Sequence, residues 1–103
     1  MPEVTINPEL LEIVQSLELS DDMNISLAKL LEKEIQRELA VYEHMAENFR
    51  TQYGMTFEEF AHSALMQGPS FSIEQDYFDW EMATTLIKDF REKLVHIYKV
   101  LRK

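Results

Sequence analysis

The sequence predicts an all-α protein, an antiparallel hairpin of two long helices. Apolar residues recur every three or four positions over two stretches of about thirty residues, which is the spacing of one face of an α-helix. The chain has only two glycines and three prolines, and all of them stand outside these stretches. It has no cysteine, so packed apolar side chains must stabilise it without disulfides.

Length and composition indicate one globular unit. With 103 residues the chain can form one core, so we expect a single helical domain over residues 1–103. A hydrophobic content of 46% with 28% charged residues is typical of globular chains. No apolar run approaches the roughly 18 residues of a membrane span, and the N-terminus lacks the features of a signal peptide. We therefore expect a cytoplasmic protein without a membrane partner.

The first elements expected are a short strand and a short helix. Residues 3–7 alternate between polar and apolar side chains, which is compatible with a short N-terminal strand. Asn7 is a suitable N-cap and Pro8 a suitable first helical residue, because proline lacks the N–H that would be unpaired there. A helix is therefore predicted over residues 8–18.

The first long helix is predicted over about residues 24–53. Asn24 is its expected N-cap, and Gly54 its expected end, because glycine adopts the left-handed conformation without steric cost. Its apolar positions are Ala28, Leu31, Ile35, Leu39, Tyr42, Ala46, Phe49 and Tyr53.

Two capping signatures predict the remaining helices. Thr56 and Glu59 form a capping box, which begins a connecting helix over residues 56–67. Ser72 opens a similar signature before the second long helix, predicted over about residues 73–102. Because the two long apolar stripes match in length and the connection is short, these helices are expected to pack antiparallel.

The net charge of −9 is unevenly distributed. Residues 1–28 and residues 51–87 each carry six acids and no base, whereas residues 88–103 carry six bases and two acids. Binding to nucleic acid needs clustered lysine and arginine, which only the last helix offers. A basic partner protein suits the acidic stretches better.

The order of a short strand and two helices resembles that of ribbon-helix-helix DNA-binding dimers. Such proteins read the major groove with strand side chains and hold phosphates with basic groups. The first base of this chain is Lys29, so no direct DNA binding is expected from the N-terminus. Dimerisation through the strand stays open.

No pattern for catalysis or for a cofactor is complete. Glu59 and His62 have the spacing of one half of a di-iron carboxylate site, but the second half is missing. Asp76, Asp79 and Glu81 lack the glycine turn of a calcium loop and suit the N-terminal end of a helix. We expect no enzyme activity, no cofactor and no metal.

Residues 49–81 hold eight of the eleven aromatic residues. Most of these rings fall at helical spacing, so they are expected to form a core that holds the turn end of the hairpin. Phe71 and Phe78 lie off the apolar stripes and are the expected anchors for a partner. Further apolar residues widen both long stripes, which predicts a homodimer or a partner protein.

Three aromatic segments carry a family resemblance. They are Phe49 with Tyr53-Gly54-Met55, then Phe57-Glu58-Glu59-Phe60, and finally Asp76-Tyr77-Phe78-Asp79-Trp80-Glu81. In these segments the chain resembles small antitoxin-like helical proteins encoded beside ribonuclease-type toxins in bacteria and archaea. The resemblance implies that the chain covers the basic RNA-binding cleft of a toxin. The residues expected to bind this partner are Phe71, Asp76, Phe78, Asp79, Trp80 and Glu81.

The alternative is a homo-oligomeric helical adaptor without a toxin. In that case the additional apolar residues of the long helices are buried between identical chains. An adjacent gene for a small basic protein would favour the antitoxin, and its absence would favour the adaptor.

Overall fold

The computed structural model describes residues 5–17 and 22–102, and it confirms the predicted all-α class. Within these ranges four helices follow one another: α1 (Pro8–Leu17), α2 (Met23–Tyr53), α3 (Phe57–Gln67) and α4 (Phe71–Leu101). Residues 5–7 are neither helix nor strand, so the expected N-terminal strand is not formed there. The remainder of that expected strand lies outside the described residues.

Polar side chains begin the first two helices. The Oδ1 atom of Asn7 accepts a hydrogen bond from the Glu9 N–H at 2.8 Å, which confirms Asn7 as the cap of α1. The predicted Asn24 cap of α2 is wrong, because Asp22 caps this helix and accepts from the Asn24 N–H at 2.8 Å. An aspartate pairs an N–H and also places negative charge at the positive end of the helix dipole.

Glycine and threonine shape the connection after α2 as predicted. Gly54 ends α2 with a left-handed φ of 65°, and Gly68 ends α3 with a φ of 67°. Between them the capping box of α3 is complete: Thr56 accepts from the Glu59 N–H, and Glu59 accepts from the Thr56 N–H, each at 3.2 Å.

The last helix begins two residues earlier than predicted. Its cap is Ser70 and not Ser72, because the Ser70 hydroxyl accepts from the Ile73 N–H at 3.3 Å. Pro69 cannot continue a helix, which makes Ser70 the first residue after the turn able to cap. As a result Phe71 is the first residue of α4 and is carried on a regular helix.

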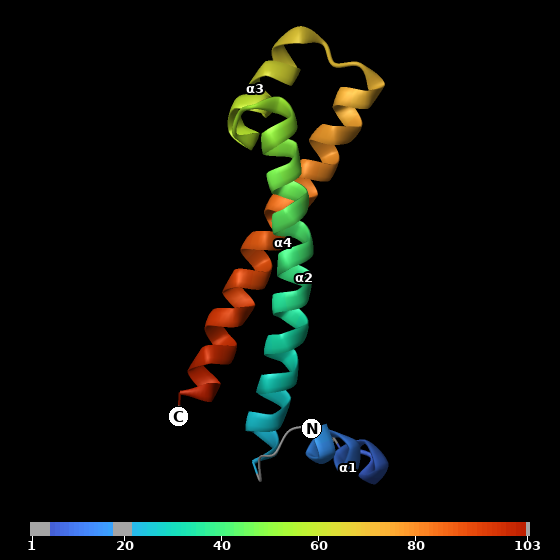
Figure 1. Ribbon diagram of the computed structural model, residues 1–103, viewed down its shortest axis with the longest axis vertical. Helices are drawn as coiled ribbons and strands as arrows, with labels where there is room; N and C mark the ends of the chain where they lie inside the picture. Colours follow the sequence, from blue (N-terminus) through green and yellow to red (C-terminus); the bar gives the residue numbers. More distant parts are fainter. Residues whose placement is uncertain (1–4, 18–21, 103) are drawn as a thin grey trace.

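Helices α2 and α4 lie side by side and run in opposite directions (Figure 1). Later residues of α2 contact earlier residues of α4, as the pairs Gln36–Tyr98, Tyr42–Phe90 and Phe49–Trp80 show. The side chains of these two helices that are buried between them include Ala28, Leu39, Ala83 and Leu94. The repeating apolar stripes of the sequence therefore form the core, except at Leu31, which was expected in the stripe of α2 and is 53% exposed.

The molecule is elongated, with extents of 57 × 28 × 23 Å and a radius of gyration of 19.5 Å. A compact domain of about 100 residues has a radius of gyration of about 13 Å. This shape leaves large apolar side chains at the surface of both long helices. The short helix α1 lies beside the start of α2, near the end of the molecule where α4 finishes (Figure 1).

Candidate protein-interaction surface

A cluster of aromatic rings surrounds Trp80 where α2, α3 and α4 meet. Trp80 is only 3% exposed. Its ring centroid lies 5.6 Å from Phe49, 5.5 Å from Phe57 and 5.2 Å from Phe60. Tyr53 adds a ring 4.4 Å from Phe60 and 6.2 Å from Trp80. The predicted aromatic core at the turn end is confirmed.

A hydrogen bond joins α2 to α4 beside this cluster. The Tyr53 hydroxyl donates to the Asp76 carboxylate, and both side chains are half-buried. Burial, followed by the hydrogen bond and the charge of Asp76, raises the pKa of Tyr53 to about 12 from its ordinary value of 10.0. The folded state therefore favours the neutral phenol.

Removing the hydroxyl of Tyr53 is expected to change the response of stability to alkaline pH. Because the pKa is raised on folding, the contribution of Tyr53 is complete below pH 10.0 and is lost as pH rises towards about 12. Tyr53→Phe should cost about 1–2 kcal/mol near neutral pH through the lost hydrogen bond, and it should weaken the alkaline decline. Urea unfolding at about pH 8, 10 and 11 measures both effects, because these values lie below, at and above the ordinary pKa of 10.0 for tyrosine.

Tyr42→Phe is the matched control, because Tyr42 stacks on Phe90 at 6.1 Å and belongs to the middle of the long helices. It should retain the alkaline decline of the wild type. An unchanged decline in Tyr53→Phe would contradict the role given to the Tyr53–Asp76 pair.

Two of the six residues expected to bind a partner, Trp80 and Asp76, contact other helices of the same chain. Trp80 was expected to offer contact area to a partner, but α2 and α3 cover its ring in this structure. Asp76 is held by Tyr53 and links two helices. Neither contact is visible in the local sequence pattern, since both depend on residues at least twenty positions away.

Phe71, Phe78 and Met82 form an exposed apolar row on α4, pointing away from α2. They are 85%, 52% and 44% exposed, respectively. Their spacing of seven and four residues places them on one side of a helix. Phe78 is steadied by an edge contact with the Tyr77 ring at 5.6 Å. The structure thus places both expected anchors, Phe71 and Phe78, at the surface and next to Met82.

Acidic side chains flank this apolar row. Glu74 and Glu81 lie seven residues apart and therefore align along one side of it, while Asp79 lies on the other side. The Gln75 amide donates to Asp79 at 3.0 Å. A hydrogen bond to Glu81, together with its charge, raises the pKa of Tyr77 above its ordinary value. The apolar row and these three acids are called the outer face of α4 below.

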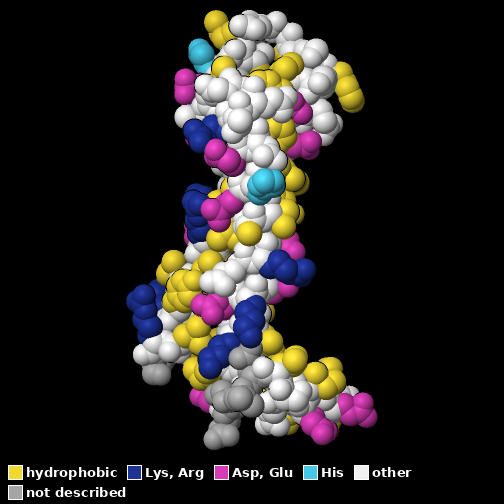
Figure 2. Space-filling view, in the orientation of Figure 1, with side chains coloured by type: hydrophobic (Ala, Val, Ile, Leu, Met, Phe, Trp, Pro, Cys, Tyr) yellow, Lys and Arg dark blue, Asp and Glu magenta, His cyan; other side chains and the backbone are white. Residues whose placement is uncertain are grey.

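The charge around the outer face of α4 has one sign. Residues 51–87 contain no lysine or arginine, so no base neutralises these acids from within α3 or the first half of α4. Figure 2 shows most Lys and Arg side chains along the lower part of the two long helices, away from the end formed by α3 and the start of α4. This end of the molecule therefore attracts basic groups.

Sequence reasoning missed two members of the outer face as contact residues. Met82 follows Phe78 by four positions and Glu74 precedes it by four, so both are its neighbours on the helix surface. This spacing is the signal that finds them once Phe78 is known to point outward. The early start of α4 at Phe71 also brings Phe71 into the same row.

One of the two residues considered for a di-metal site, Glu59, has a structural role. Glu59 completes the capping box of α3. Over residues 5–17 and 22–102, no three His, Asp or Glu side chains gather in a way that could hold a metal ion. Among the described helices, none combines the length and hydropathy that a membrane span requires.

Comparisons of the chain with protein-family models, with curated proteins and with solved structures each found no match.

Proposed function

We propose that this chain is an antitoxin-like interaction protein that binds and neutralises a basic, ribonuclease-type toxin. The observation that carries this proposal is the outer face of α4, which combines exposed aromatic side chains with acids and has no nearby base. Exposed large apolar side chains rimmed by charge are typical of protein-binding sites. The sequence resemblance to antitoxin-like proteins adds the class of partner.

In this proposal the two kinds of side chain have different tasks. Phe71 and Phe78 enter apolar pockets of the toxin and supply most of the affinity, as buried aromatic anchors do. Glu74, Asp79 and Glu81 face the lysine and arginine side chains that bind RNA phosphates in the toxin. Their charge raises the association rate and occupies the cleft in place of RNA.

The helical frame suits a preorganised contact. The two long helices act as an antiparallel hairpin, and the cluster around Trp80 fixes the first half of α4 from beneath. A surface that is already ordered loses less entropy on binding, which favours tight inhibition. The proposed role is stoichiometric, non-catalytic and cytoplasmic, where the RNA substrates of such a toxin are found.

Reversing the charge of the outer face is expected to slow neutralisation at low salt. The probe is the small basic ribonuclease that this proposal expects an adjacent gene to encode, and its activity is titrated with this chain. The triple variant Glu74→Lys, Asp79→Lys and Glu81→Lys should slow association by at least about 10-fold at low salt, an effect that fades at high salt. Stopped-flow binding and RNA cleavage give the two readouts.

The matched control changes the total charge by the same amount at another place. It carries three reversals in α2: Glu32→Lys, Glu34→Lys and Glu38→Lys. This variant should keep most of the association rate. Equal inhibition by the wild type and by a folded outer-face variant would show that the acids have no part in the mechanism. If the protein encoded by the adjacent gene does not bind at all, the antitoxin proposal is overturned.

A homo-oligomeric adaptor is the second candidate function. It is favoured by the exposed apolar side chains of Leu27, Leu31 and Val41, which leave one side of α2 uncovered. A chain that self-associates through α2 and has no basic partner would support this candidate.

A further inference from the structure

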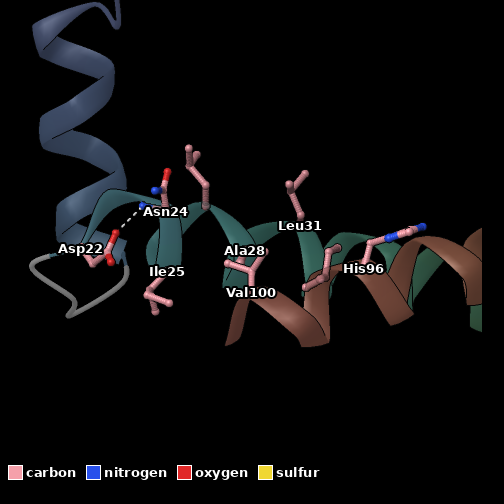
Figure 3. Close-up of a pocket in the computed structure, with 9 residues that line it drawn as sticks. Asp22, Asn24, Ile25, Ala28, Leu31, His96 and Val100 are labelled. Carbon is pink, nitrogen blue, oxygen red and sulfur yellow. Dashed lines mark hydrogen bonds between the residues drawn. The ribbon is translucent and has the colours of Figure 1, made fainter. Parts of the chain in front are cut away.

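An apolar groove lies at the end of the molecule opposite to the outer face of α4. It has a volume of about 530 Å³ and separates the first turns of α2 from the last turns of α4 (Figure 3). Ile25, Ala28 and Leu31 line it from α2, and Ile97 and Val100 from α4. Asp22 stands at its edge, where the carboxylate is engaged in capping α2. The walls of this groove are therefore mainly hydrophobic.

Helix α1 carries an uncovered apolar stripe near this groove. Leu10, Ile13 and Leu17 follow one another at helical spacing, and each is more than half exposed. The neighbouring Leu11 and Val14 are only half-buried, and no residue of α1 is buried. Helix α1 thus leaves its apolar side largely exposed in the isolated chain.

The stripe and the groove match in length and in charge. Leu10 to Leu17 spans about 10 Å along a helix, and Ile25 to Leu31 spans about 9 Å. Helix α1 carries Glu9 and Glu12 and no base, whereas residues 93–102, which include the α4 wall of the groove, carry three bases and no acid. An α1 helix that enters such a groove brings Glu9 towards the basic end of α4, including Lys93 and Lys99.

We propose that two copies of this chain form a two-fold dimer in which α1 of each copy lies in the groove of the other. Both elements sit at the same end of the molecule, near the end of α4 (Figure 1). One two-fold axis at that end therefore fills both grooves at once, and the assembly closes without further sites. This dimer is independent of the toxin proposal, because the outer face of α4 lies at the other end.

The absence of cysteine in the natural chain allows a direct test of this exchange. One preparation carries Ile13→Cys and a second carries Leu31→Cys, and the two are mixed, left to exchange subunits and oxidised. The expected product is the disulfide-linked heterodimer, formed at least about 10-fold faster than with Met82→Cys in place of Leu31→Cys, because a disulfide needs Cβ atoms about 3.8 Å apart. Leu10→Cys with Val100→Cys tests the neighbouring register in the same way.

The mass in solution gives an independent readout. Sedimentation equilibrium of the wild type should give twice the mass of one chain, and Leu10→Asp with Ile13→Asp should weaken association by at least about 100-fold. Circular dichroism confirms that the variant folds, and Met82→Asp is the matched control that keeps the dimer. A wild-type monomer would overturn the proposal. A doubly substituted chain, Ile13→Cys with Leu31→Cys, that forms only an intramolecular disulfide would also overturn it and would place α1 in the groove of its own chain.

Discussion

Replacing Trp80 with alanine is expected to lower the free energy of unfolding by about 3–5 kcal/mol. The ring is 3% exposed and contacts aromatic side chains of both α2 and α3. Its removal leaves a cavity where three helices meet, and the surrounding rings cannot all move in to fill it. For a chain of this size the melting temperature should fall by at least about 12 °C. Urea unfolding followed by circular dichroism measures the change.

Phe71→Ala is the control, because it removes a large aromatic ring that is exposed and not buried. Because Phe71 is 85% exposed, its replacement should change the free energy of unfolding by less than about 0.5 kcal/mol. Trp80 is the only tryptophan of the chain, so its fluorescence reports the packing of the cluster during wild-type unfolding. A Trp80→Ala protein as stable as the wild type would show that the cluster does not hold the three helices together.

Removing both aromatic anchors is expected to cost binding while leaving the fold intact. Phe71→Ala with Phe78→Ala should weaken the affinity for the basic partner by at least about 30-fold, since buried aromatic anchors commonly contribute 2 kcal/mol or more. The exposed positions of both side chains predict little change in unfolding. Isothermal titration of the partner into wild type and variant gives the ratio of affinities.

Val41→Ala provides a matched control for these anchors. Its side chain is 53% exposed, close to the 52% of Phe78, but it belongs to α2. The partner should bind this variant with wild-type affinity. A loss through Val41→Ala that equals the loss through the Phe71 and Phe78 variant would move the contact to α2 and favour the adaptor.

The elements of the fold could be predicted because their signals are local. The Thr56–Glu59 capping box and the left-handed Gly54 each act within a few residues, and both formed as expected. The two wrong caps show the limit of such signals. A suitable capping residue stands two residues before each predicted cap: Asp22 before Asn24, and Ser70 before Ser72. In both cases the earlier residue is the N-cap.

The candidate site could be predicted only in part. Contacts with distant segments of the chain decide which of its residues are buried and which are exposed. Phe71 and Phe78 were expected outside the core because they miss the apolar stripes, and they are exposed. Trp80 and Asp76 belong to the same aromatic and acidic run, yet α2 and α3 cover the first and Tyr53 holds the second. A run of similar residues on a helix therefore divides between core and surface according to which neighbours reach it.

Hydrogen exchange of the complex tests most directly whether the outer face of α4 is the partner-binding surface. The chain is exchanged alone and with the basic protein that the proposal expects an adjacent gene to encode, and peptides from α2, α3 and α4 are compared. We expect added protection to concentrate on residues 71–82, with little change along residues 27–41 of α2. Added protection along residues 27–41, with none on residues 71–82, would show that the outer face of α4 is not the partner-binding surface.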